Sequence, residues 1–574
     1  MIPAKAAHKN PPGRSAWLLL AAIVIGLPSC SPDPADADFA VVIRGGTIYD
    51  GLGGDPVVAD LAIAGDRIVA IGSLADSSGA IEIDAEGLAV APGFINMLSW
   101  ANESLIEDGR GLSDIRQGVT LEVMGEGTSM GPLNDAMRAE AIERQGDIKY
   151  DIVWTTLGGY LDFMAAKGIS PNIASYVGAT TVRVHEVGYA DRPPTEEELV
   201  RMQELVRRAM REGAIGVGSS LIYAPASFAS TEELIALVRV AAEYDGSYVS
   251  HIRSEGSRLE EAVQELIKIA SLTGAPAEIY HLKAAGRDNW HKLSNVFDLV
   301  EAARQAGLRI TANMYNYTAG STGLDATMPL WVQEGGHDAW VTRLKDPEIR
   351  ARVVAEMKLP ADEWENFYVG AGPEGILLAG FNNEDLRPLT GKSLQEVADE
   401  RGTDPAATAI DLVIEDDSRV DAVFFLMSED NIHRKLALPW VSFGSDAGAL
   451  AAEGVFINKN SHPRAYGNFS RLLGKYVRDE KIIPLQEAIR RMTSLPASNI
   501  GIDSRGQLSE GYYADVVIFD PERITDTATF EEPHQYATGI WHVFVNGEQV
   551  LKNGRHTGAT PGRVVRGPGW DGWL

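Results

Sequence analysis

The middle of the chain alternates short apolar segments with longer amphipathic ones. The amphipathic stretches 196–212, 231–243 and 259–272 carry apolar residues at a spacing of three to four, which predicts helices. The short apolar segments between them predict buried strands. We expect eight strands, at 88–98, 121–124, 172–177, 213–218, 248–251, 277–281, 309–313 and 441–445. Strands that alternate with helices predict a parallel sheet, and eight alternations predict an α/β fold of the TIM-barrel type, (β/α)8.

Both ends of this α/β region have a different pattern. Runs of β-branched residues at 40–44 and 67–71 are bounded by Gly and Asp, which predicts hairpins, and similar runs return at 514–520. One small β-sandwich domain built from both termini explains the pattern more economically than two unrelated β subdomains. We therefore assign its two parts to residues 39–92 and 501–574.

The predicted barrel spans residues 93–500 and contains one long interruption. Between Trp331 and Asp421 the alternation of strands and helices pauses for longer than a single connection between a strand and a helix requires. We interpret residues 332–420 as an insertion that caps the site as a lid.

The N-terminus has the features of a secretory signal peptide at residues 1–29. A basic region with Lys5, Lys9 and Arg14 precedes the apolar segment 16–27, which is too short to span a membrane.

The last residue of this apolar segment begins a Leu-Pro-Ser-Cys sequence that resembles the bacterial lipobox. Its cysteine, Cys30, is the only cysteine of the chain. The interpretation is a lipidated Cys30 followed by a flexible acidic tether, residues 30–38, and Ser31 suits sorting to the outer membrane, facing the periplasm. An ordinary signal peptide with an unrelated Cys is the alternative. The formal net charge of −29 argues against a nucleic-acid partner. The lipid anchor is the one membrane contact that we expect.

Three residues that can act in a metal site each close a predicted strand. His251, His281 and Asp446 end the fifth, sixth and eighth strands, and in a TIM barrel those ends meet at the catalytic face. Neutral imidazoles and carboxylates are ordinary zinc ligands. A single histidine at a strand end is more often structural, but the three residues together favour a metal site.

The motifs around these residues resemble one branch of the amidohydrolase superfamily, the N-acyl-D-amino-acid deacylases or D-aminoacylases. The resemblance covers most of the chain after residue 38. It rests on the joint order of the stretches 250–255, 281–286, 314–322, 444–446, 462–467 and 493–497. It implies a TIM barrel with a small β-sandwich, a zinc ion held by His251 and His281, and Asp446 as the group that takes the proton of the nucleophilic water.

The chain departs from the branch at two metal-binding positions. The first barrel strand of the branch normally ends in His-x-His, but Leu98 and Trp100 stand there, so we expect one zinc ion per chain rather than two. Spacing from Phe94 places the third zinc ligand of the branch at Gly127, which has no side chain. Glu126 is the nearest replacement. The alternative is that Glu126 lies behind the ligands or in solvent.

Four further positions match substrate-binding residues of the branch, namely Lys283, Tyr315, Ser321 and Arg464. We expect Lys283 and Arg464 to hold the substrate carboxylate, because a guanidinium can bind a carboxylate with two hydrogen bonds. Without the resemblance, a surface salt bridge would explain Arg464 equally well.

Other positions predict the surroundings of the site. We expect Glu255 to brace the His251 loop rather than touch substrate. Met97, Trp100 and Ala179 predict an apolar side of the pocket and a hydrophobic preference there.

These features together predict a metal-dependent hydrolase of a carbon–nitrogen amide bond, most similar to the deacylases of N-acyl-D-amino acids. The expected substrate is a small N-acyl amino acid or a short peptide. Two alternatives remain at this point: an envelope peptidase or isopeptidase that acts on peptides containing D-amino acids, and a non-catalytic envelope binding protein. Retention of both histidines and Asp446 argues against the second alternative.

Overall fold

The computed structural model describes residues 37–572. The predicted signal peptide, Cys30 and most of the predicted tether lie outside the described residues. Within the described part of the chain, no helix combines the length and the apolar character needed to cross a membrane.

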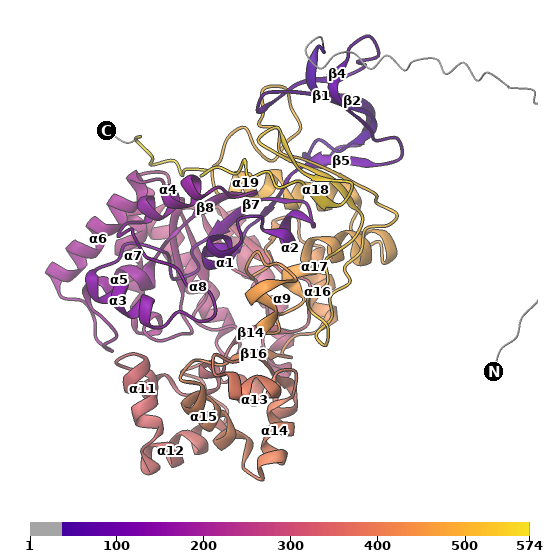
Figure 1. Cartoon of the computed structure of the whole chain (residues 1–574). Helices are drawn as coiled ribbons and strands as arrows, with labels where there is room; N and C mark the ends of the chain where they lie inside the picture. The colour runs from indigo at the N-terminus through magenta and orange to yellow at the C-terminus, as the bar shows by residue number, and fades with distance from the viewer. Residues whose placement is uncertain (1–36, 573–574) are drawn as a thin grey trace, which may run out of the picture.

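The described residues contain a ring of parallel strands that forms the centre of the molecule (Figure 1). In chain order its strands are β6 (Phe94–Asn96), β7 (Val119–Met124), β8 (Asn172–Ser175) with β9 (Val177–Gly178), β10 (Gly216–Ser220), β11 (Ser247–His251), β12 (Ala277–Ile279), β13 (Ile310–Met314) and β17 (Val441–Phe443). The segments β8 and β9 are one strand interrupted at Tyr176, because β8 pairs with β7 and β9 pairs with β10. The ring therefore has eight strands where the sequence predicts them, except that only 94–96 of the predicted first strand, 88–98, lies in the ring, because 89–92 forms a strand of another sheet.

Hydrogen bonds between the first and the last strand close the ring. The amide of Met97 donates to the carbonyl of Phe443 at 3.1 Å, and the amide of Asp446 donates to the carbonyl of Leu98 at 2.9 Å. Gly444 permits this approach, because a Cβ there would lie 2.8 Å from the Cβ of Leu98. The predicted TIM-type barrel is thus confirmed.

Amphipathic helices cover the outside of the ring (Figure 1). They include α4 (Leu157–Lys167), α5 (Ala179–Glu186), α6 (Glu196–Arg211), α7 (Thr231–Ala242), α8 (Leu259–Thr273) and α9 (Leu293–Gln305), and later α16 (Glu429–Leu436), α17 (Arg464–Arg471), α18 (Leu485–Met492) and α19 (Ser494–Asn499). Helix α6 shows why they form. A capping box between Thr195 and Glu198 begins it, and Met202, Val206 and Met210 bury one face at a spacing of four residues. The three helices that the sequence predicts by range are confirmed within a few residues at each end.

Strands from both ends of the chain share one further sheet. The N-terminal segment supplies β1 (Phe39–Ile48), β2 (Val57–Ala64), β3 (Arg67–Gly72), β4 (Gly79–Asp84) and β5 (Ala89–Pro92), and the C-terminal segment supplies β18 (Val516–Phe519), β19 (Ile540–Val545), β20 (Glu548–Lys552) and β21 (Arg555–His556). The two segments join where β5 pairs antiparallel with β18. The β-rich ends therefore form one small domain beside the barrel, at the top of Figure 1.

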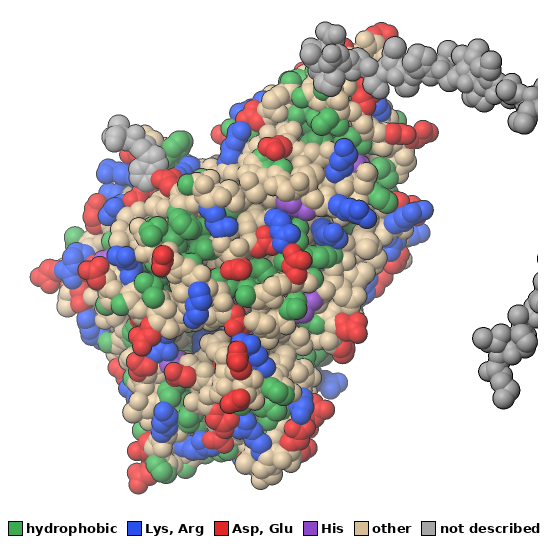
Figure 2. Space-filling view, in the orientation of Figure 1, with side chains coloured by type: hydrophobic (Ala, Val, Ile, Leu, Met, Phe, Trp, Pro, Cys, Tyr) green, Lys and Arg blue, Asp and Glu red, His purple; other side chains and the backbone are tan. Residues whose placement is uncertain are grey.

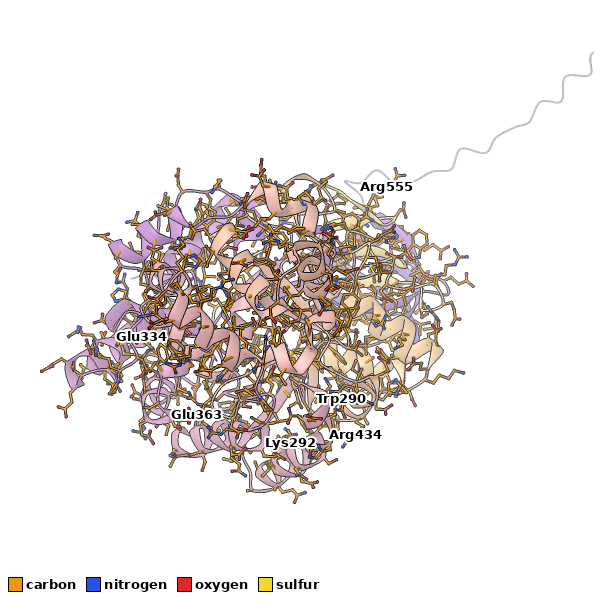
Figure 3. All side chains as sticks on the ribbon, turned by 90° about the horizontal axis from the view of Figure 1, so that it is seen from below. Trp290, Lys292, Glu334, Glu363, Arg434 and Arg555 are labelled. Carbon is orange, nitrogen blue, oxygen red and sulfur yellow. The ribbon has the colours of Figure 1, made fainter. Side chains whose placement is uncertain are left out.

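A third unit lies at the bottom of Figure 1. It holds a small sheet of β14 (Gly320–Gly323), β15 (Ile376–Gly380) and β16 (Asp421–Phe424), and the helices α10 (Leu330–Gln333), α11 (His337–Leu344), α12 (Pro347–Met357), α13 (Phe367–Ala371), α14 (Leu394–Arg401) and α15 (Pro405–Asp416). Seen from below, these helices lie in front of the barrel (Figure 3). The sequence pattern misses β15, because a five-residue apolar run does not distinguish a strand from a helix.

Charged side chains of both signs are interspersed over the face shown in Figure 2.

Candidate active site

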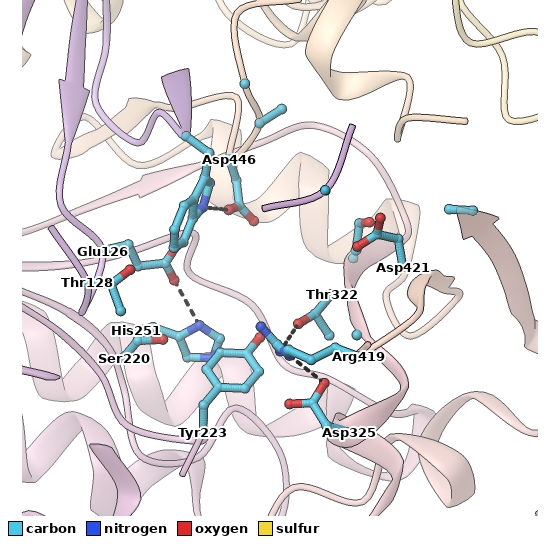
Figure 4. Close-up of a pocket in the computed structure, with 18 of the residues that line it drawn as sticks. Glu126, Thr128, Ser220, Tyr223, His251, Thr322, Asp325, Arg419, Asp421 and Asp446 are labelled. Carbon is cyan, nitrogen blue, oxygen red and sulfur yellow. Dashed lines mark hydrogen bonds and ion pairs between the residues drawn. The ribbon is translucent and has the colours of Figure 1, made fainter. Parts of the chain in front are cut away.

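Three side chains from three barrel strands converge at the carboxyl ends of those strands. Glu126 follows β7, His251 ends β11 and His281 follows β12. Figure 4 shows Glu126 facing His251. The Glu126 Oε1 atom lies 3.0 Å from His251 Nδ1 and 3.0 Å from His281 Nε2. All three side chains are buried. These are the three residues that the sequence analysis proposes as metal ligands.

This donor set fits a zinc ion. One carboxylate oxygen and two imidazole nitrogens are typical zinc ligands at about 2.0–2.2 Å. Donors bound tetrahedrally at such distances lie about 3.4 Å apart, and here the oxygen is 3.0 Å from each nitrogen. A small outward shift of the donors would admit the ion.

The backbone explains why Glu126, and no residue at 127, reaches the centre. Gly127 has a φ of 69°, and a Cβ there would lie 2.6 Å from the Cβ of Ser220, so a side chain is excluded. Gly125 has a φ of 106°, and the chain turns sharply on both sides of Glu126.

His281 also has an unusual backbone, with a φ of 32°, which is uncommon for a residue with a side chain. Asn313 holds this conformation, because its side-chain oxygen accepts from the His281 amide at 2.8 Å and its carbonyl accepts from the Leu282 amide at 2.8 Å. The strain is therefore fixed by neighbouring groups at a position that aims an imidazole into the site.

Glu255 lies behind both histidines, so it braces His251 as the sequence predicts and also contacts His281, which the sequence does not predict. Its Oε1 atom is 3.0 Å from His281 Nδ1, and its Oε2 atom is 3.6 Å from His251 Nε2. A carboxylate hydrogen-bonded to the far nitrogen fixes the orientation of a metal-binding imidazole, and the contact with His281 is short enough for this. The contact with His251 is longer than a hydrogen bond. The spacing to His251 alone could have suggested one of these contacts, but the contact with His281 depends on the fold.

Opposite charges shape the titration of this cluster. Burial alone would raise the pKa of Glu126, but the two imidazoles hold it well below its usual range. Burial and Lys283 act to lower the pKa of His281, yet the carboxylates of Glu255 and Glu126 prevail and raise it to about 9. In the absence of a cation, the carboxylates therefore favour a proton on His281.

Asp446 faces this cluster from the end of β17. Its side chain is 11% exposed, and its partial burial raises its pKa although the Arg464 guanidinium, at 2.8 Å from Asp446 Oδ2, acts in the opposite direction. Arg464 is itself buried, stacks over the ring of Tyr315 at 4.5 Å, and has an Nε atom without a hydrogen-bond partner. Asp446, Arg464 and Tyr315 thus form one group beside the proposed metal ligands.

The other two proposed substrate-binding residues are already engaged. The Lys283 ammonium lies 2.6 Å from Glu255 Oε1 and 2.6 Å from His281 Nδ1. The Ser321 hydroxyl donates to the carbonyl of Ala422 at 3.1 Å. Both residues line the same cavity as Arg464, and their contact with substrate stays a prediction.

The prediction that Met97 and Trp100 make one side of the pocket apolar is wrong. Met97 and Leu98 are fully buried and pack in the barrel core with Leu121 and Val123 instead of facing the cavity. Trp100 does line the cavity, but it presents its polar edge. Its Nε1 atom lies 3.0 Å from Glu126 Oε2 and 3.2 Å from Asp446 Oδ1.

A cavity of about 1050 Å³ joins all of these groups. Its walls come from the barrel and from the unit at the bottom of Figure 1, which contributes Arg419 and Thr322 beside Tyr223 (Figure 4). The size and the convergent polar groups are those of a small-molecule site.

The comparison with known proteins agrees with this geometry. A model of the amidohydrolase family matches residues 154–551. The chain belongs to this family. The D-aminoacylase of Alcaligenes xylosoxydans xylosoxydans is 33% identical over 531 residues, which cover 92% of this chain and 97% of that amidohydrolase. The resemblance that the sequence motifs indicate is thus confirmed.

Solved amidohydrolase structures extend the likeness. The N-acyl-D-glutamate deacylase of Bordetella bronchiseptica, solved with zinc and a phosphonate that mimics the tetrahedral intermediate, matches with a TM-score of 0.77 and 30% identity over 92% of this chain and 99% of that one. A D-aminoacylase described by one-metal activation and second-metal attenuation matches with a TM-score of 0.77 and 32% identity, over 92% of this chain and all of that one (100%).

Proposed function

We propose that this amidohydrolase is a zinc-dependent deacylase of N-acyl-D-amino acids. The observation that carries the proposal is the convergence of Glu126, His251 and His281 with Asp446 and Arg464 in one cavity. The identity of about 33% to D-aminoacylase over most of the chain supports the same reaction class. The peptidase and binding-protein alternatives have no such support.

Each group of the site has a role in hydrolysis of an amide bond. When bound, zinc supplies a Lewis acid that activates water at neutral pH and polarises the carbonyl. Asp446 accepts the proton of the attacking water and delivers it to the leaving amine, the ordinary double role of a general base. The Arg464 guanidinium, which lines the cavity, binds the substrate carboxylate.

Tyr315 suits the role of a hydrogen-bond donor to the scissile carbonyl. Burial, with Asp446 and Glu255 nearby, raises the pKa of its hydroxyl well above the usual value, although Arg464 opposes this. The hydroxyl therefore keeps its proton at neutral pH. The hydroxyl donates a weak hydrogen bond to Met427 Sδ at 4.0 Å. Rotation about its C–O bond can therefore direct the hydrogen atom to a substrate carbonyl.

We further propose a single zinc ion per chain. Leu98 lies in the core, and Trp100 offers an N–H group, which donates and has no lone pair for a metal. Elemental analysis of the purified protein should give about one tightly held zinc per chain, and two tightly held ions would refute the proposal.

The reaction is tested by mixing zinc-loaded protein with N-acetyl-D-amino acids and, in parallel, with their L-enantiomers. We expect amine release from the D-substrates, loss of activity with a chelator, and recovery with zinc. His251→Ala should lose both metal and activity. A fully zinc-loaded protein that hydrolyses no N-acyl amino acid of either hand would contradict the proposal.

For the N-terminus we propose lipidation at Cys30 and a place in the cell envelope, on the outer membrane facing the periplasm. The support is the apolar segment that ends in Leu-Pro-Ser-Cys. Cys30→Ser should move the protein from the membrane fraction to the soluble fraction with hydrolysis intact. A wild-type protein found entirely in the soluble periplasm would overturn this proposal.

A further inference from the structure

The side chain of Trp100 lies between two carboxylates of the site. Its indole Nε1 is 3.0 Å from Glu126 Oε2 and 3.2 Å from Asp446 Oδ1. An indole has one N–H hydrogen, so both oxygens share one donor. The two acceptors belong to residues with different tasks in the proposed reaction, a metal ligand and a general base.

The backbone fixes Trp100 beside Asp446. The Trp100 amide donates to the carbonyl of Ala447 at 2.9 Å, and the Asp446 amide donates to the carbonyl of Leu98 at 2.9 Å. These bonds close the barrel between β6 and β17, and Ser99 bridges Ala447 in parallel register. The closure of the barrel therefore holds the backbone of Trp100 beside that of Asp446, and the Trp100 side chain, 39% exposed, reaches along the cavity to both carboxylates.

The contact with Glu126 determines which of its oxygens can bind a cation. Oε1 faces both imidazoles at 3.0 Å, and Oε2 accepts the indole N–H. The Glu126 side chain is buried at 4% exposure, so water does not readily replace this donor. Rotation of the carboxylate would break the indole hydrogen bond, and Oε1 alone remains aimed at the metal position.

We propose that Trp100 is a positioning residue of the active site: its indole N–H holds Glu126 as a one-oxygen ligand and Asp446 as the base in one fixed arrangement. This inference rests on the proposed function. Loss of the N–H leaves the contacts of Glu126 with the histidines and of Asp446 with Arg464 in place, but it removes the one donor that fixes the second oxygen of each carboxylate. Zinc affinity and turnover should fall together, whereas binding of the substrate carboxylate by Arg464 should not change.

The test compares Trp100→Phe, which keeps an aromatic ring without the N–H group, with the matched control Trp154→Phe. Trp154 donates its indole N–H to the carbonyl of Met130 at 2.7 Å, is 4% exposed and lies outside the cavity. The readouts are zinc affinity of the metal-free protein by competition with a chelator, kcat and KM at saturating zinc, and the Tm of the metal-free protein.

For Trp100→Phe we expect zinc affinity to fall by about 10–100-fold, the loss typical of a group behind a metal ligand. At saturating zinc, kcat should fall at least about tenfold, because a poorly aligned base loses part of its catalytic effect, with KM within about twofold of the wild-type value. Trp154→Phe should keep both zinc affinity and kcat, whatever its Tm.

A second variant removes doubt about folding of Trp100→Phe. Incorporation of 3-benzothienylalanine at position 100 keeps the size of the bicyclic ring and replaces the N–H by sulfur. The same losses are expected. If this variant and Trp100→Phe both retain wild-type zinc affinity and kcat, the inference is wrong.

Failure of the proposed function would give a different result. In that case the wild-type protein itself would bind no zinc at the chelator concentrations used or would hydrolyse no N-acyl-D-amino acid. A wild-type protein that does both, beside position-100 variants that match it, overturns only the role of Trp100.

Discussion

Replacement of Glu126 by glutamine tests the least conventional part of the proposed zinc site. The change keeps the size of the side chain and removes its charge, and a neutral amide is a weak ligand for a cation that is otherwise held by two neutral imidazoles. Loss of a true ligand should cost more than the 10–100-fold that a group behind the ligands costs. We therefore expect zinc affinity to fall by more than about 100-fold, or about 2.7 kcal/mol.

The size of this loss in zinc affinity depends on pH, because Glu126 also stabilises a proton on His281, and this proton competes with zinc. The pKa of His281 is raised to about 9 by carboxylates that include Glu126, and zinc requires the neutral imidazole. At pH 7 the wild-type protein must give up this proton before zinc binds, which opposes zinc binding. Its zinc affinity should thus rise with pH up to about 9 and then level off.

In Glu126→Gln the pKa of His281 should be lower, so the affinity should level off at a lower pH. The loss relative to wild type is therefore smaller at pH 7 than at pH 9. Competition with a chelator at both pH values measures this difference. Glu122→Gln serves as the control, since Glu122 is a buried carboxyl of the same strand that accepts from Asn96 at 2.9 Å and has no contact with the histidines.

Two outcomes would refute the reasoning. Equal zinc affinity of wild type and Glu126→Gln at pH 9 would mean that another residue completes the site. A loss within 10–100-fold at pH 9 would place Glu126 behind the ligands.

Four further outcomes are expected. Asp446→Asn should lower kcat by about 10²–10⁴-fold and keep its zinc, which metal analysis beside kinetics would check. Arg464→Lys should raise KM at least about tenfold, as a point charge replaces a planar guanidinium, with kcat less affected; an unchanged KM would remove Arg464 from the substrate carboxylate. Burial raises the pKa of Asp446, and a base acts only when deprotonated, so the rate should be full above this raised pKa and fall as pH drops through it. Removal of zinc should lower the Tm of wild type but not of His281→Ala, because zinc stabilises only a fold that binds it.

The barrel could be predicted from the sequence because each strand carries its own local signal. Apolar runs of four to eight residues between amphipathic helices are read without any knowledge of distant contacts. The strand at 376–380 was missed because its partner in the sheet, 421–424, lies far away in sequence. Pairing with this partner, rather than a local pattern, makes it a strand.

The candidate site was predictable for residues that stand at strand ends. His251, His281 and Asp446 follow this rule. The contacts of Glu255 with His281 and of Trp100 with Glu126 were not predictable, because they join different strands and depend on side-chain rotamers. The sequence shows that Trp100 cannot bind a metal, but it does not show which edge of the indole faces the cavity.

The closure of the barrel and the chemistry of the site use the same short segments. The bonds that join β6 to β17 place Trp100 and Asp446 side by side, and Gly444 allows the strands to approach because any Cβ there would collide with Leu98. A substitution at Gly444 would therefore move the base and the indole relative to Glu126 before it opened the barrel. Because the carboxylates share one N–H hydrogen, even a small separation of these two strands breaks one of its two contacts. The relative positions of Trp100, Asp446 and Glu126 therefore depend on the close approach of the first and last strands of the barrel.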